Sequence, residues 1–166
     1  MLIKRKSFIY LSFFSLLVII LFLFFHLKTI YFLEINDLTN KKIYSYKLDN
    51  EYFSLGYTHS VMKTEIEEFF KVENENIKLV KTEYSSFGVG LPFLPEEGKL
   101  EIKNDKMILN INRNFKNINM AIFPIAKHYL RLNNKKYRLS EDILGDKPTK
   151  ISITIKKKYR LKGGEL

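Results

Sequence analysis

The chain of 166 residues contains no cysteine, and it has only three histidines, four prolines and seven glycines. Without cysteine, disulfides, zinc–thiolate sites, thiol catalysis and lipid attachment through a thiol are excluded. The sequence also lacks G-x-G-x-x-G, a P-loop lysine, H-E-x-x-H and G-x-S-x-G. These motifs position phosphates, zinc or a nucleophilic serine. We therefore expect a protein that is not an enzyme and that carries no cofactor. A hydrolase of unknown type is the disfavoured alternative, because no set of nucleophile, base and orienting residue is visible.

Basic residues outnumber acidic ones, 28 to 18, which gives a net charge of +10. Nucleic-acid binding would require these charges to cluster beside stacking aromatic side chains. Apart from the basic residues near the N-terminus, the chain has one basic cluster, in the C-terminal stretch 156–162. Such blocks are usually solvated, and contact with anionic lipid headgroups is the second interpretation. We expect no nucleic-acid partner.

One long apolar run stands near the N-terminus, where positions 7–25 contain no charged residue. A helix of this length spans roughly 30 Å, the thickness of the hydrocarbon core of a bilayer. Lys4, Arg5 and Lys6 precede it, and basic flanks stay in the cytoplasm. A cleaved signal peptide would have a shorter apolar run followed by small residues. We therefore expect a single-pass cell-membrane protein, with a cytoplasmic stub and transmembrane signal anchor in residues 1–28. An extracytoplasmic domain would follow in residues 29–166.

Beyond the apolar run the sequence favours an all-β domain. Apolar and polar residues alternate with a period of two, which is typical of strands with one buried face. Asn104-Asp105 and Asn133-Asn134 lie between such segments and predict tight hairpin turns. About eight or nine short strands indicate an antiparallel β-sandwich or barrel. A short helical turn near residues 140–144 is also predicted, with Ser140 as its N-cap. The predicted strands are 52–61, 66–72, 77–84, 100–103, 107–111, 118–123, 129–132, 136–139 and 151–155.

Two predictions concern the middle of the chain. Residues 84–98 hold three of the seven glycines and two of the four prolines, so we expect a shaped loop there. In the hairpin before it, we place Val61 opposite Ile66. His59 would then face Glu68 on the apolar side of the sheet, where a pairing would offset the cost of burying both.

Two stretches, YTHSVMKTEIEEFFKV (57–72) and YSSFGVGLPFLPEEG (84–98), resemble the motifs of family 1850 of the domains of unknown function. That family has a Y-x-H-S-V-x-x-T-P-[IV]-x-E core followed by Y-x-S-[FW]-G-[AV]-G-L-P and an acidic E-G. Asn112-Arg113 is similar to its later N-R pair, whereas Glu65 occupies the usual proline position. The resemblance covers most of residues 50–155.

The resemblance implies a small membrane-anchored protein that accompanies tripartite (TRAP-type) transporters of the TAXI class. We therefore expect a non-enzymatic accessory protein whose partners are the lipid bilayer and a TRAP-type permease or its solute-binding protein. The alternative is an extracytoplasmic module that binds a small ligand or a metal. A metal site formed by two histidines with Glu68, Glu96 or Glu97 matches no recurrent ligand spacing, so none is predicted. The candidate ligand or partner residues are His59, Ser60, Glu68, Tyr84, Gly88, Gly90, Pro92, Glu96, Glu97 and Arg113.

Overall fold

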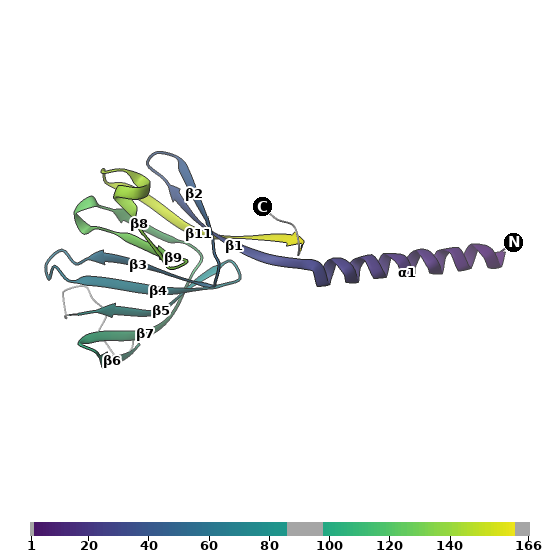
Figure 1. Ribbon diagram of the computed structural model, residues 1–166, viewed down its shortest axis with the longest axis horizontal. Helices are drawn as coiled ribbons and strands as arrows, with labels where there is room; N and C mark the ends of the chain where they lie inside the picture. The colour runs from purple at the N-terminus through teal and green to yellow at the C-terminus, as the bar shows by residue number, and fades with distance from the viewer. Residues whose placement is uncertain (1, 86–97, 162–166) are drawn as a thin grey trace. The chain divides into compact units, whose positions relative to one another are not determined.

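The computed structural model describes residues 2–85 and 98–161, which divide into two units (Figure 1). One unit comprises Tyr31–Lys157, and the other holds the N-terminal residues up to Ile30 with the C-terminal residues from Lys158. The helix α1 (Leu2–His26) belongs to the second unit. Among the described residues, no helix is both long enough and apolar enough for a membrane span. The expected N-terminal helix is confirmed, and its insertion in a membrane stays a prediction.

Two sheets form the rest of the fold, and the strand neighbours in them are mostly antiparallel. The smaller sheet has four strands in the order β2-β1-β11-β8, and the larger has seven in the order β10-β9-β3-β4-β5-β7-β6. The four strands are β1 (Leu27–Asp37), β2 (Lys42–Lys47), β8 (Ile118–Ile122) and β11 (Thr149–Leu161). The seven are β3 (Tyr52–Thr58), β4 (Glu65–Glu73), β5 (Asn76–Tyr84), β6 (Lys99–Lys103), β7 (Lys106–Phe115), β9 (Tyr129–Leu132) and β10 (Lys135–Arg138).

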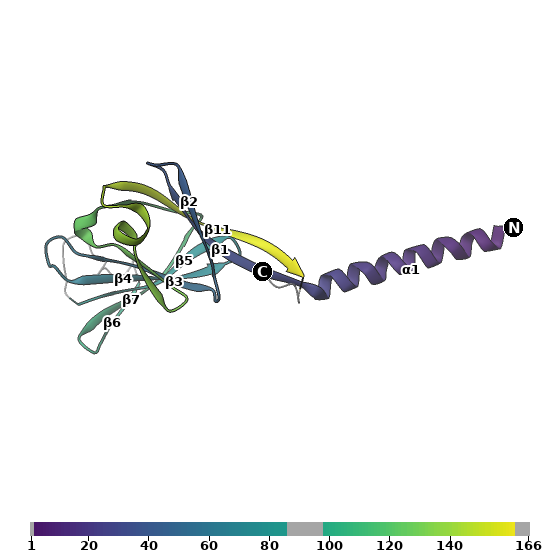
Figure 2. The same ribbon diagram turned by 45° about the horizontal axis from the view of Figure 1, so that its top comes forward.

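The two sheets, whose strands are drawn in Figure 2, share one apolar core. Leu33 and Ile153 contribute to it from the smaller sheet, and Phe53, Phe70 and Leu130 contribute from the larger. Each lies one position away from polar residues on the other face of its strand, as the period of two requires. The rings of Phe53 and Phe70 stack across β3 and β4 with centroids 5.1 Å apart. The expected all-β architecture is therefore confirmed as a sandwich-like pair of sheets.

The two hairpin turns read from the sequence are both present. Asn104 and Asp105 join β6 to β7 with φ of 52° and 57°, and Asn133 and Asn134 join β9 to β10 with φ of 50° and 61°. Positive φ at both central residues is the geometry of a type I′ turn, which matches the twist of the flanking strands. Asparagine and aspartate tolerate this conformation better than most residues do.

Three details differ from the sequence prediction. The strands β1 and β2 were not predicted, although Leu33, Ile35 and Asp37 alternate towards the buried face. The predicted helical turn is a π-helical segment, η3 (Leu139–Leu144), and its N-cap is Arg138. Ser140 is thus not a cap. The backbone amide of Arg138 donates to the carboxylate of Asp142, at 2.7 Å.

Candidate functional site

The residues proposed from the sequence fall into two groups. Gly88, Gly90, Pro92, Glu96 and Glu97 lie outside the described residues. The others lie within them: His59 and Ser60 follow β3, Glu68 is in β4, Tyr84 ends β5, and Arg113 is in β7.

The predicted pairing of His59 with Glu68 is wrong. In the register of β3 with β4, Tyr57 lies opposite Ile66 and Leu55 lies opposite Glu68. The turn begins earlier than expected because the Nδ1 atom of His59 accepts hydrogen bonds from the amides of Val61 and Met62, at 3.3 and 3.1 Å. The amide of His59 also donates to the carbonyl of Thr64, at 2.9 Å. His59 therefore organises the turn, and Ser60 is exposed within it.

Glu68 lies on the core-facing side of the larger sheet, opposite Leu55 on β3 and Thr82 on β5. Burial raises the pKa of the Glu68 carboxyl, and the positive charge of Arg113 opposes that rise. The structure thus brings these two predicted residues close enough to interact, from β4 and β7 on either side of β5. Tyr84 is buried in a small apolar cluster with Ile66 and Leu109, so it packs the sheet.

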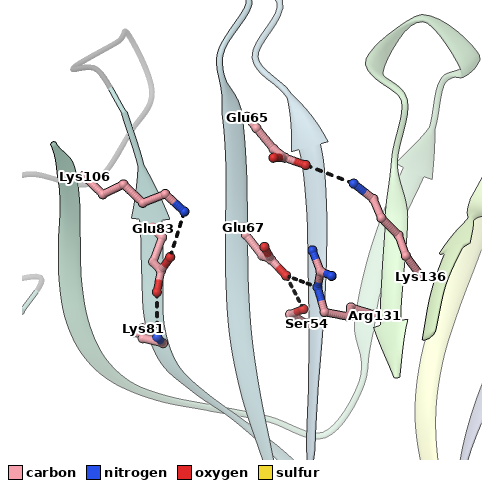
Figure 3. Close-up of polar contacts among 8 residues, drawn as sticks. All are labelled: Ser54, Glu65, Glu67, Lys81, Glu83, Lys106, Arg131 and Lys136. Carbon is pink, nitrogen blue, oxygen red and sulfur yellow. Dashed lines mark hydrogen bonds and ion pairs between the residues drawn. The ribbon is translucent and has the colours of Figure 1, made fainter. Parts of the chain in front are cut away.

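On the opposite face of the same sheet lies a network of ion pairs that sequence reasoning missed (Figure 3). The Oε1 atom of Glu67 accepts from the hydroxyl of Ser54 at 2.5 Å and from Nε of Arg131 at 3.0 Å. Burial alone would raise the pKa of Glu67, but these hydrogen bonds hold it below its usual value. The pair Lys136–Glu65 adds a contact of 3.2 Å. Figure 3 also shows Glu83 between Lys81 and Lys106, at 2.6 and 3.4 Å.

Tyr129 connects this network to the sheet beneath it. It lies directly opposite Gly56 in the pairing of β9 with β3. Its ring occupies the space of the missing side chain, because a Cβ atom on Gly56 would lie 2.1 Å from Cζ of Tyr129. The Nζ atom of Lys136 lies 3.6 Å from the centre of the ring, a cation–π contact. Burial and the neighbouring carboxylates of Glu65 and Glu67 raise the pKa of Tyr129.

A cavity of about 340 Å³ opens beside Tyr129. Its walls come from the end of β3, the start of β4, the segment 124–129, β10 and the first turn of η3. His128 and Ser140 line it, and they are only 8% and 4% exposed. The amide of Leu139 donates to the carbonyl of His128 at 2.9 Å, which holds the start of η3 against the segment before β9. The ring of His128 lies 5.7 Å from that of Tyr57.

Three buried polar atoms of residues in this cavity wall, among them the hydroxyl of Tyr129, have no hydrogen-bond partner among the described residues. The other two are Nδ1 of His128 and Oγ of Ser140. Buried polar atoms are nearly always paired in native proteins, so each exception calls for an explanation. Burial lowers the pKa of His128, against the opposing effect of a hydrogen bond to the Phe123 backbone. Burial therefore favours the neutral form of the imidazole.

The arrangement provides hydrogen-bonding groups and paired charges. Among the side chains described, no three His, Asp or Glu residues come together in a way that could hold a metal ion. Sequence reasoning did not find the cavity because its residues come from five separate segments, with no fixed spacing. The available sequence signal was weak: Tyr129 and Arg131 alternate with Leu130 and Leu132 on a short strand.

Comparison with known proteins identifies the domain that carries these features. The family model described as Domain of unknown function (DUF1850) matches residues 53–139. The matched range includes His59 and Glu68, the Glu67 network, and the cavity residues His128 and Tyr129. No curated protein and no solved structure matches the chain. Because the match covers more than half of the 166 residues and agrees with the two motifs read from the sequence, the chain belongs to the DUF1850 family of domains of unknown function.

Proposed function

We propose that this protein is a non-enzymatic accessory protein of a TRAP-type solute transporter of the TAXI class. In this proposal α1 anchors it in the cell membrane and the β domain lies outside the cytoplasm. The partner is the permease of the transporter or its solute-binding protein. The family membership supports the transporter association, because the motifs around residues 57–72 and 84–98 resemble those of proteins that accompany such transporters.

The observation that carries the membrane part of the proposal is the character of α1. The helix has 25 residues, which makes it about 37 Å long, and its positions 7–25 contain no charge. Its described apolar side chains, including Phe13, Phe14 and Val18, are exposed. Such a surface would be unfavourable in water and is favourable in lipid. Lys4, Arg5 and Lys6 favour a cytoplasmic N-terminus by the positive-inside rule.

A topology reporter tests the orientation. A reporter enzyme that functions only in the cytoplasm should be inactive when it is fused after Leu166 and active when fused before Met1. A variant with Lys4, Arg5 and Lys6 replaced by glutamine is the matched control, since it leaves the apolar run intact and removes the orienting charges. Reporter activity of the C-terminal fusion in the unchanged protein would overturn the orientation.

Co-purification tests the transporter association. We expect the protein to be recovered with the multi-span permease, or with its solute-binding protein, after solubilisation in mild detergent from cells that express a TAXI-class transporter. Mass spectrometry identifies the recovered proteins. The same β domain on an unrelated membrane anchor is the control that separates contacts of the domain from contacts of α1. Recovery of the protein alone from such cells would contradict the association.

The second candidate, a module that binds a small ligand or a metal, is favoured by one observation. The β domain contains a cavity whose buried polar groups are incompletely bonded among the described residues. No comparable observation supports binding of a metal. The polar groups of the cavity indicate the chemical class of a small ligand.

A further inference from the structure

The hydrogen-bonding state of His128 defines one requirement for a ligand of the cavity. The Nδ1 atom of His128 is buried and has no hydrogen-bond partner among the described residues. In a neutral imidazole one ring nitrogen donates and the other accepts. A ligand hydroxyl can satisfy Nδ1 in either tautomer because it both donates and accepts, whereas a carboxylate only accepts.

Hydroxyl groups complete the polar part of the wall. The hydroxyl of Ser140 is buried and can both donate and accept. Tyr129 is 2% exposed, and its ring is fixed between Gly56 and the Nζ atom of Lys136. An alcohol group both donates and accepts, so it can bond to Nδ1 of His128 and to a hydroxyl of the wall.

The charged residues around the cavity largely neutralise one another. Lys136 pairs with Glu65 at 3.2 Å. Arg138 pairs with Glu141 and, at 3.3 Å, with Asp142. A charged ligand would have to compete with these existing partners, so the site is not arranged for a strong anion or cation. The volume of about 340 Å³ lies near the lower limit of about 300–1,000 Å³ that is typical of small-molecule sites, which indicates a small ligand.

We propose that the cavity beside Tyr129 binds a small, uncharged, polyhydroxylated molecule, with one ligand hydroxyl bonded to Nδ1 of His128 and another bonded to the hydroxyl of Ser140. This proposal does not depend on the transporter association. It stands on two side chains more than nine-tenths buried that line the cavity with unmet hydrogen-bonding capacity among the described residues.

The experiment uses the full chain with ¹⁵N-labelled histidine rings, in a detergent without sugar groups. The chain has three histidines, and the variants His128→Gln and His59→Gln assign the ring signals. The probes are glycerol, glucose and myo-inositol, with acetate as a charged comparison. We expect at least one polyol to shift the Nδ1 signal of His128 saturably, while the signals of His59 stay in place. Acetate should produce no saturable shift.

Variants then test the role of each hydroxyl. Ser140→Ala should raise the dissociation constant of the bound polyol roughly three- to tenfold, which corresponds to one hydrogen bond. It should leave the melting temperature without ligand equal or higher, because the lost hydroxyl had no partner among the described residues. Tyr129→Phe keeps the ring over Gly56 and provides a second variant. Ser45→Ala, on exposed β2, is the matched control and should leave binding unchanged.

Three results would overturn the proposal. One is the absence of a saturable His128 shift with all three polyols. Another is acetate binding more tightly than any polyol. The third is unchanged polyol affinity in both Ser140→Ala and Tyr129→Phe, since binding would then take place elsewhere or without the wall hydroxyls.

Discussion

The contact between Gly56 and Tyr129 makes a sharp prediction about stability. Gly56→Ala places a methyl group where the tyrosine ring now lies, 2.1 Å from Cζ and 2.3 Å from the hydroxyl oxygen. Two non-bonded heavy atoms cannot lie this close together, so the ring of Tyr129 has to move. Its movement is restricted because Lys136 covers the ring at 3.6 Å.

The expected magnitude follows from two opposing effects. Overpacking of a well-filled site costs about 1–3 kcal/mol. Replacement of a strand glycine by alanine regains about 0.5–1 kcal/mol of conformational free energy. The net loss for Gly56→Ala should therefore be about 1–2 kcal/mol, and for a domain of this size it lowers the melting temperature by roughly 4–8 °C.

A double-mutant cycle attributes this loss to the ring. Unfolding in urea is followed by circular dichroism for the wild type, Gly56→Ala, Tyr129→Ala and the double variant. In the Tyr129→Ala background, Gly56→Ala should be neutral or stabilising, since the methyl group then enters free space. Gly145→Ala serves as the control, because a Cβ there meets nothing within 4 Å and its cost comes only from the positive φ of 87°. Equal losses for Gly56→Ala in both backgrounds would refute the reasoning.

Three further predictions concern the pH dependence of unfolding. Arg131→Gln should move acid unfolding to higher pH, because Arg131 helps to lower the pKa of Glu67 in the folded state. A lowered pKa stabilises the fold at pH values above the unfolded-state pKa, and this stabilisation is lost as pH falls through the folded-state pKa. An unchanged acid midpoint by circular dichroism would contradict it. Glu68→Gln should stabilise the domain more at pH 7 than at pH 4, because burial raises the pKa of Glu68 and ionisation of that carboxyl becomes costly as pH rises through it. Urea unfolding at both pH values measures this, and an equal gain would argue against a buried acid. His128→Gln should reduce the loss of stability below about pH 6.5, since burial lowers the pKa of His128 and the unfolded state takes up the proton first. Thermal melts between pH 5 and 8 test it, and parallel profiles for both proteins would exclude the effect.

The features that were predictable from the sequence are those set by neighbouring residues. The turns at Asn104-Asp105 and Asn133-Asn134 depend on residues that tolerate positive φ, and the flanking strands follow from the period of two. The all-β architecture and the family could therefore be read in advance. The strand β2 was harder to predict because most of its side chains are exposed, so its sequence shows no buried face.

The register of β3 with β4 could not be predicted from the alternation of apolar and polar residues alone. Val61 fits the apolar alternation of the strand, but it lies within the turn and is exposed. The hydrogen bonds from Val61 and Met62 to the ring of His59 decide where the strand ends. An imidazole that accepts backbone amides acts much as an Asx side chain does in a turn, and no propensity for histidine indicates this. Because the end of β3 was misplaced, the predicted register set Glu68 opposite His59, whereas Glu68 lies opposite Leu55.

The cavity shows why a site can be absent from the sequence pattern and still be well defined in the fold. Gly56 leaves room for the ring of Tyr129, the ring and Lys136 form one side of the wall, and η3 brings Ser140 to the other. Read singly, these residues look like a weak point in a strand, a core aromatic and a helix cap. Only the pairing of β3 with β9, two strands far apart in the chain, brings them together. Substitutions at Gly56 should therefore alter the cavity as well as stability, because the position of Tyr129 depends on the missing side chain. Polyol titration of Gly56→Ala measures this dependence, and wild-type affinity in that variant would show that the ring does not shape the site.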